Sequence, residues 1–340
     1  MSSTLSSVLC PCQNVRRTCQ MVMEETDLIH LKDEKVKSLA QKMTLQADQA
    51  VVEWDSDGWH YSGGTGPEKK ERIALYILAL DAINFCFWPH PSMKASNTLE
   101  YDHLAIALRK LAELDDEKNG TNDNYFFRPD NLSRLTVGEI KSSLEPYLAH
   151  HLPNISERCR LWNELGEVLL QSFEGSAMKL ISSSGYSAPS LVKIVVEKIP
   201  GFRDEAIWRG KWMAFYKRAQ IVVGDLNAAL KLNMKHLDEL TTFADYRVPQ
   251  VLRHWGALQY SKQLSEKVDS LEELDSEEEI SIRAATVVCV DEIVCAMKNL
   301  STNDACINAV TVDWYLWQVG EELNQKGDLK PHHRVNTIFY

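Results

Sequence analysis

The sequence has few of the features that mark membrane proteins or metal-binding proteins. No stretch of its 340 residues approaches the roughly 20 apolar residues that span a bilayer. None of its eight cysteines belongs to a CxxC pair with the spacing of a zinc site, because Cys10 and Cys12 form only a CxC. From this we expect reduced thiols, a cytoplasmic protein, no structural metal and no membrane partner.

Positive charge is also scarce. The chain has 37 Lys and Arg against 48 Asp and Glu, for a formal net charge of −11. Binding along a phosphate backbone requires clustered Lys and Arg, so we expect no direct contact with DNA or tRNA. A small anionic ligand held by a few local cations is compatible with this balance. The glycines in 62–66 lack the spacing and the flanking strand of a phosphate-binding loop.

Alternating strand-like patterns are nearly absent, whereas apolar residues recur at helical spacing in long segments. These segments are 71–88, 104–114, 135–148, 155–173, 189–198, 212–230, 280–300 and 305–320. With 44% hydrophobic residues, the chain can bury a large core. No internal repeat or linker divides it. We therefore predict an all-α fold in a single domain over 1–340, with a flexible N-terminus at 1–14.

Polar residues interrupt the apolar stripe of the helix predicted over 71–88. Asn84 falls within that stripe, and Asp81 lies three positions before it, which brings two side chains together on a helix surface. A buried amide must form hydrogen bonds. The two residues are therefore either a polar pair satisfied internally or part of a pocket wall with the aromatic residues Phe85 and Trp88.

His60 lies in a loop between Trp59 and Tyr61, in a stretch with no sustained helical or strand period. Two interpretations are open for a histidine in such surroundings. It either packs against its aromatic neighbours or contacts a ligand, and the pattern alone favours packing.

A carboxylate and a guanidinium stand close together at Asp245 and Arg247, directly before Val248 and Pro249. We predict a short helix over 237–243, and we expect the proline to keep the residue before it extended, so that the chain turns. On the residues alone, the aspartate either caps the turn and pairs with the arginine, or projects into a cleft.

Two predicted helices carry further charged candidates. The helix over 212–230 has a continuous apolar face, and Lys217 points away from it. In the helix over 305–320, Asp313 and Trp317 share one side, so a carboxylate lies beside an indole. Such a carboxylate should be partly desolvated and should need a partner, either a ligand or a nearby arginine.

Three segments in combination resemble the queuosine salvage family. They are Asn84-Phe-Cys-Phe-Trp-Pro89, Phe215-Tyr-Lys-Arg-Ala-Gln-Ile221 and Phe243-Ala-Asp-Tyr-Arg-Val-Pro-Gln250, followed by Asp313 and Leu316-Trp317. The resemblance runs from about Arg16 to the C-terminus. Family members are N-glycosidases that release queuine from queuosine 5′-monophosphate, and they resemble helical DNA glycosylases in fold. The resemblance implies a hydrolase with this substrate and product, and with no cofactor.

The resemblance also implies roles for individual residues. Asp245 corresponds to the catalytic carboxylate, and Lys217 is placed near the ribose phosphate. Candidates for binding the base include His60, whose surroundings match the family least well, and a minor departure is Gly224 in place of alanine. The expected substrate-binding residues are His60, Asp81, Asn84, Phe85, Trp88, Lys217, Phe243, Tyr246, Arg247, Asp313 and Trp317.

The chemistry explains why a carboxylate is needed. Cleavage of an N-glycosidic bond passes through an oxocarbenium-like state with positive charge at C1′. Removing a preorganised group that stabilises such charge costs roughly 3–4 kcal/mol of barrier. An ordinary purine is helped to leave by protonation at N7, but a 7-deazapurine has carbon there. The carboxylate must therefore carry more of the catalysis, as an electrostatic stabiliser or as a covalent nucleophile.

Other classes of function remain open on the sequence alone. The main alternative is a helical protein that binds a nucleoside or a partner without turnover, because no catalytic cluster is evident without the resemblance. A DNA-base glycosylase is disfavoured by the acidic charge and by the lack of a basic DNA-facing stretch.

Overall fold

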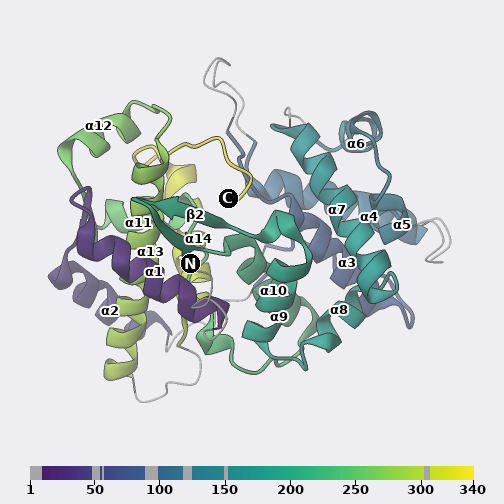
Figure 1. Ribbon diagram of the computed structural model, residues 1–340, viewed down its shortest axis with the longest axis horizontal. Coiled ribbons are helices and arrows are strands. Elements are labelled where there is room, and N and C mark those ends of the chain that lie inside the picture. The colour runs from purple at the N-terminus through teal and green to yellow at the C-terminus, as the bar shows by residue number, and fades with distance from the viewer. Residues whose placement is uncertain are drawn as a thin grey trace. The chain divides into compact units, whose positions relative to one another are not determined.

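The computed structural model describes residues 10–47, 54–55, 57–88, 99–117, 125–148, 152–301 and 307–340. They form two compact units, and each unit is assembled from segments that are not continuous in the sequence. Unit 1 comprises Met1–Glu53, Asp204–Gln220 and His236–Val335, and unit 2 comprises Trp54–Arg203, Ile221–Lys235 and Asn336–Tyr340. Figure 1 labels many of their elements.

Unit 1 is built around the long helix α13 (Ser276–Leu300), which packs against α1 and α2. Its other helices are α1 (Pro11–Glu25), α2 (Asp33–Ala47), the 3-10 helix η3 (Leu237–Glu239), α11 (Arg247–His254), α12 (Lys262–Asp269) and α14 (Ala309–Lys326). Two antiparallel pairs of strands accompany them: β1 (Ile29–Leu31) with β4 (Leu258–Tyr260), and β2 (Glu205–Trp208) with β3 (Lys211–Ala214).

Local sequence explains why α13 begins where it does. The Asp275 side chain accepts hydrogen bonds from the backbone N–H groups of Glu277 and Glu278, and the Glu278 carboxylate accepts one from the Asp275 N–H. This capping box places acidic residues at the positive end of the helix dipole. Further along, apolar side chains such as Ile282 and Cys289 pack with those of α2, α11 and α14 into the core of unit 1.

The described residues of unit 2 form helices joined by turns and loops. Its elements are α3 (Lys69–Ala82), α4 (Tyr101–Glu117), α5 (Pro129–Leu132), α6 (Val137–Leu144), α7 (Ile155–Phe173), α8 (Ala177–Ser183), α9 (Ala188–Lys198) and the 3-10 helix η2 (Pro200–Phe202). Helix α3 is buried from Arg72 to Ala82 and packs on α4, α7 and α8. The boundary between the units falls within α10 (Lys217–Leu230).

The predicted fold class is confirmed, since the described residues are predominantly helical and their strands form only two small sheets. No helix among them combines the length and apolar character needed to cross a bilayer. The prediction of one domain over 1–340 stays a prediction. The flexible N-terminus predicted for 1–14 also stays a prediction: residues 11–14 begin α1, and 1–9 lie outside the described residues.

The helix predicted over 71–88 is wrong at its end, because α3 stops at Ala82. The buried guanidinium of Arg158 donates hydrogen bonds to the carbonyl oxygens of Ile83, Phe85 and Cys86. Those carbonyls are therefore satisfied outside a helix. Asn84 follows the helix instead of interrupting its apolar stripe, so helical spacing does not relate it to Asp81.

Two other predicted helices are too long. Residues 212–214 of the helix predicted over 212–230 belong to strand β3, and α10 starts at Lys217. The helix predicted over 237–243 is one 3-10 turn, Leu237–Glu239. Beyond it, the side-chain amide of Gln220 exchanges two hydrogen bonds with Thr241, which takes the place of helical bonding there.

The expectation that Val248 is extended is also wrong, because Val248 and Pro249 lie in the first turn of α11. A proline is tolerated in a first turn, where its missing N–H would have no partner within the helix. The last helix was predicted to end at Gly320, but α14 continues to Lys326.

Candidate active site

Asp245 lies directly before α11, after the non-helical segment 240–244. Its Oδ1 atom accepts hydrogen bonds from the backbone N–H groups of Arg247 at 3.0 Å and Val248 at 2.9 Å. The carboxylate therefore caps the first N–H groups of the helix, which is the capping part of one of the two interpretations, and lies at the positive end of the helix dipole. The Arg247 guanidinium donates to Glu321 and Gln250, each at 2.7 Å.

The environment of Asp245 is dry but contains a compensating charge. The residue is only 7% exposed, and burial raises the pKa of its carboxyl above the ordinary 3.8. The charge of Lys217 and the two backbone N–H groups act in the opposite direction. These contacts favour the ionised form and thus limit the increase in pKa.

Asp313 is a second buried carboxyl group, on the second turn of α14. Its Oδ1 atom accepts a hydrogen bond from the Thr242 hydroxyl and another from the Phe243 N–H at 2.8 Å. Burial and the negative charge of Asp245 raise the pKa of Asp313 to about 8. The predicted desolvation of Asp313 is confirmed by its burial. Its hydrogen-bond partners in the protein are the hydroxyl of Thr242 and the backbone N–H of Phe243.

Lys217 is the cation that acts on both carboxyl groups. It is the first residue of α10 and is 4% exposed, although the sequence placed it off the apolar face of its helix. Its charge opposes the increases in the pKa of Asp245 and of Asp313. The structure therefore assembles two carboxyl groups and one ammonium from three separate segments of unit 1.

In both carboxyl groups, the Oδ2 atom is left for a ligand. Among the residues that the structure describes, no donor is hydrogen-bonded to Oδ2 of Asp245 or to Oδ2 of Asp313, since the contacts above all reach Oδ1. At neutral pH, Asp313 retains its proton while Asp245 ionises more readily. The cluster can thus present a carboxylate and a neutral carboxyl group to one ligand.

The remaining candidates in unit 1 lie near Asp245 or Asp313 along the chain. Phe243 and Tyr246 are buried, and the Tyr246 ring lies 4.6 Å from that of His332. Trp317 is half-buried on α14, one turn after Asp313. Gly320 follows on the same helix, where a Cβ atom would come within 2.7 Å of the Arg247 side chain, so the glycine permits close packing of α14 on α11.

In unit 2, His60 uses both ring nitrogens within the protein. Nδ1 lies 2.7 Å from Oδ1 of Asp55, and Nε2 lies 2.7 Å from the Tyr101 hydroxyl. The ring also stacks on Trp54 with a centroid separation of 4.4 Å. The interpretation of a packed loop histidine is therefore the one that the structure describes.

The other candidates in unit 2 form separate groups. Asp81 is fully buried in α3, and its charge adds to the effect of burial in raising the pKa of Tyr101. Phe85 lies 4.3 Å from the Arg158 guanidinium, and the Trp88 ring lies 6.4 Å from that of Tyr340. Asn84 is buried in the same turn. These residues stay predictions, because none of these contacts identifies a ligand.

Several residues that build the cluster were not among those predicted from the sequence. Gln220 belongs to one of the segments that carry the resemblance, and Thr242 directly precedes another. Their positions in the sequence could therefore have identified them. Gln220 links these segments directly, because its amide reaches the Phe215 carbonyl at 2.9 Å and Thr241 at 2.8 Å. Asp204 and Arg283 pair across 79 positions and have no local signal.

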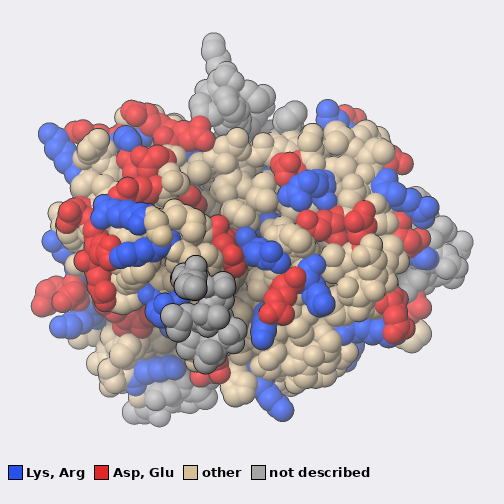
Figure 2. All heavy atoms as spheres, viewed as in Figure 1, with Lys and Arg blue, Asp and Glu red and all other residues tan. Residues whose placement is uncertain are grey.

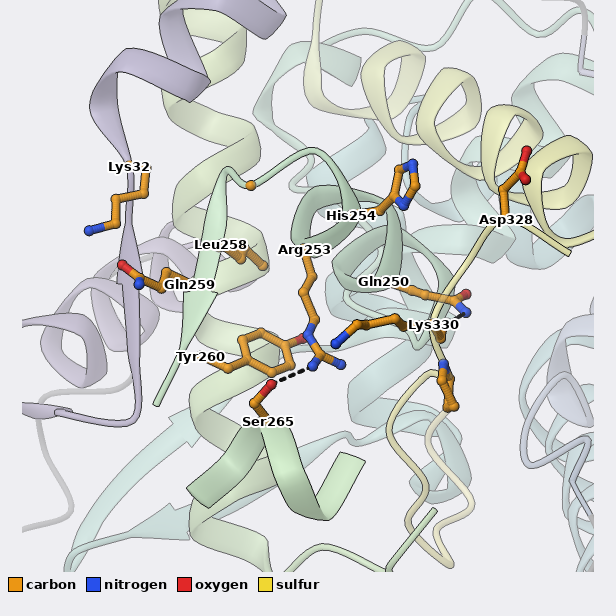
Figure 3. A pocket seen from close by; sticks show the side chains of 12 residues that line it. Lys32, Gln250, Arg253, His254, Leu258, Gln259, Tyr260, Ser265, Asp328 and Lys330 are labelled. Atoms are coloured by element: carbon orange, nitrogen blue, oxygen red, sulfur yellow. Dashed lines mark hydrogen bonds between the residues drawn. The ribbon is translucent and has the colours of Figure 1, made fainter. Parts of the chain in front are cut away.

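A cavity of about 710 Å³ lies at the other end of α11 (Figure 3). Gln250 lines it and donates to the Lys330 carbonyl at 2.6 Å. Arg253 and Lys330, which approach each other in the figure, both pair with Asp269 at 2.8 Å. Both cations already pair with this carboxylate, and we assign no ligand to the cavity. Among the described residues, no group of three or more His, Cys, Asp or Glu is placed to hold a metal ion.

Comparison with known proteins finds relatives along most of the chain. A family model described as "Queuosine salvage protein" matches residues 65–340. A protein of Dictyostelium discoideum is 37% identical over 320 residues, which are 91% of each chain. A protein of Sphaerobacter thermophilus is 35% identical over 336 residues, covering 96% of this chain and 97% of the other. One of Mus musculus is 28% identical, covering 96% and 98%. All three are named queuosine 5′-phosphate N-glycosylase/hydrolase.

Proposed function

The chain belongs to the queuosine salvage protein family, and we propose that it hydrolyses the N-glycosidic bond of queuosine 5′-phosphate and releases queuine. The observation that supports this most directly is the buried pair formed by Asp245 and Asp313, with Lys217 beside it. In hydrolysis, the bond from C1′ to the base breaks and C1′ bonds to the oxygen of water. The base leaves with the electron pair and gains a proton.

Asp245 is the proposed catalytic residue. Its Oδ2 atom has no hydrogen bond with a described residue, so it can approach positive charge at C1′. The helix N–H groups and Lys217 favour its ionised form in a dry environment. A carboxylate held in this way stabilises an oxocarbenium-like state without reorganising. It acts either electrostatically or as a nucleophile that forms a bond to C1′ and is then displaced by water.

We further propose that Asp313 and Phe243 bind the base, with Tyr246, Arg247 and Trp317 around it, and that no cofactor takes part. The guanine-like edge of queuine offers N–H donors to Asp313, and aromatic rings offer stacking faces. Lys217 is proposed to interact with the ribose phosphate. The roles expected for unit 2 stay predictions, at His60, Asp81, Asn84, Phe85 and Trp88.

The direct test is incubation with queuosine 5′-monophosphate, followed by chromatography for free queuine. We expect release that increases with time and with enzyme concentration. A matched control is Asp238→Asn, which removes an exposed aspartate from the same segment and should leave the rate unchanged. Binding of the nucleotide without any release would contradict the proposal and favour the non-catalytic alternative.

The acidic balance supports a small substrate over a polynucleotide. On the face shown in Figure 2, Lys and Arg of the described residues are interspersed with Asp and Glu. The net charge of −11 gives a polynucleotide little attraction. We expect kcat/KM to be highest for the 5′-monophosphate, lower for the nucleoside and lowest for intact tRNA. Equal or faster cleavage of tRNA would contradict this order.

We also propose a cytoplasmic location. The cysteines in the described part of the chain are free thiols, as expected in a reducing compartment. Fractionation of cells that express the full chain tests this proposal, and recovery in an organelle fraction would contradict it.

A further inference from the structure

Arg283 contacts both of the segments that carry charge into the site. It lies on α13, is 2% exposed and belongs to unit 1. Its Nε atom donates to the carbonyl oxygen of Ala244 at 3.0 Å, directly before Asp245. Its Nη1 and Nη2 atoms donate to the two carboxylate oxygens of Asp204 at 3.1 and 2.6 Å.

Asp204 in turn holds the start of α10. Its Oδ2 atom accepts a hydrogen bond from the backbone N–H of Lys217 at 3.1 Å. Its backbone carbonyl accepts another from Phe215 at 2.9 Å, and the Phe215 ring lies 3.9 Å from the Arg283 guanidinium. One guanidinium therefore connects the residue before Asp245 to the turn that precedes Lys217.

We propose that Arg283 is a positioning residue which, together with Asp204, sets the separation between the Asp245 carboxylate and the Lys217 ammonium. This inference rests on the proposed function, because the separation matters only if Asp245 stabilises charge on the substrate. The hydrogen bonds of Arg283 to Ala244 and Asp204 connect it to the Asp245 carboxyl group indirectly, through the backbone.

The geometry requires an arginine. A guanidinium offers donors in a rigid plane, so it can bind both oxygens of Asp204 and still direct Nε to a carbonyl. A lysine keeps the charge but cannot make this set of contacts together. The conservative variant Arg283→Lys therefore separates geometry from charge. Glu279 also lies 3.3 Å from Nη1, so the lysine would keep a nearby carboxylate.

The first experiment compares steady-state rates of Arg283→Lys and wild type with queuosine 5′-monophosphate. Misplacement of a catalytic group by about 1 Å can reduce the rate roughly 100-fold. We expect kcat to fall about 10- to 100-fold, with KM changed less than about threefold. A matched control is Arg16→Lys, because Arg16 also binds two carbonyls and one aspartate in unit 1. Its carbonyl partners precede Thr241, so we expect kcat within about twofold of wild type.

A second variant shows whether a lower rate results from misfolding. Arg283→Lys can leave Asp204 incompletely paired, whereas the double substitution of Asp204→Asn with Arg283→Gln removes both charges together. We expect this double variant to keep the helical circular dichroism of wild type and still to lose about tenfold or more in kcat.

Two readouts distinguish positioning from simple stabilisation of the fold. If Arg283 acts through Asp245, then Arg283→Lys should cost little in a background that already contains Asp245→Asn, measured in single turnovers. The acid limb of kcat/KM should also move to higher pH, because Asp245 loses part of the effect of Lys217 on its pKa. Arg247 and Asp313 also act electrostatically on Asp245, and they are unchanged in this variant.

The positioning role would be overturned if the rate losses of Arg283→Lys and Asp245→Asn were additive when the two are combined. It would also be overturned if the acid limb of kcat/KM did not move, even if Arg283→Lys were slow. A wild-type rate for Arg283→Lys would overturn it directly. Failure of the proposed function looks different, because the wild-type protein would then release no queuine at all.

Discussion

Asp245 and Asp313 are both buried carboxyl groups in unit 1, but their local surroundings differ. Asp245 caps the N-terminus of α11 and receives two backbone N–H groups. Asp313 lies within α14, where one hydroxyl and one backbone N–H reach it. The cap stabilises negative charge on Asp245 more strongly. The proton of the pair is therefore held preferentially by Asp313.

This difference indicates different roles for two side chains of the same type. In the proposed reaction, a carboxylate is needed beside C1′, whereas a group with a pKa near the working pH can change its protonation state when the base binds. Donors on the base favour the ionised form of Asp313, so binding should release its proton. Four changes test this contrast, beginning with the largest expected effect.

Removing the charge of Asp245 should have the largest consequence. Asp245→Asn keeps the shape of the side chain and an oxygen that can cap α11, so the protein should fold. We expect base release to fall by about two to three orders of magnitude, corresponding to roughly 3–4 kcal/mol of barrier. Single-turnover assays measure the residual rate, and turnover close to wild type in a folded variant would refute the catalytic assignment.

Asp313→Ala should weaken binding more than it slows the chemical step. Loss of a hydrogen bond to a charged group costs about 1.5–3 kcal/mol, so KM should increase about tenfold or more, with a much smaller change in kcat. Calorimetry should also show that wild type releases a proton when it binds queuine below pH 8, whereas the variant does not. Unchanged queuine affinity in the folded variant would remove Asp313 from base recognition.

Gly320→Ala tests whether close packing between α11 and α14 fixes the positions of Asp245 and Asp313 relative to each other. The added Cβ atom would lie 2.7 Å from the Arg247 side chain and 2.9 Å from Val251, so one helix must shift. Overpacking of this kind costs about 1–3 kcal/mol in the free energy of unfolding. Urea denaturation measures the loss. The matched control is Gly138→Ala in unit 2, where the nearest atom would be 3.9 Å away, and equal effects at both sites would contradict the prediction.

The raised pKa of Asp313 predicts a pH dependence of stability. The unfolded group has a pKa of about 3.9 and the folded group about 8, so the folded protein binds more protons between these values. The free energy of unfolding should therefore fall as pH rises through this window, by at most about 1.4 kcal/mol per pH unit from this residue. Asp313→Asn should be less sensitive to pH between 5 and 8, and parallel curves would contradict this.

Much of the fold was predictable because its signals are local. The helix predicted over 155–173 coincides with α7, since an uninterrupted apolar period defines it. Predictions failed where a distant side chain supplies the backbone's hydrogen bonds. Arg158 ends α3 at Ala82, and Gln220 holds Thr241 out of a helix. Neither contact is visible in a window of neighbouring residues.

The sequence by itself determined the helical class of this protein, its family and the residues available for catalysis, because periodicity and motifs are written along the chain. Only the tertiary structure decided which charges meet. It brings Asp245, Asp313 and Lys217 together, and it pairs Asp204 with Arg283 across 79 positions. The difference in proton affinity between the two aspartates also arises at this level, because desolvation and Coulomb interactions depend on what surrounds a group in space.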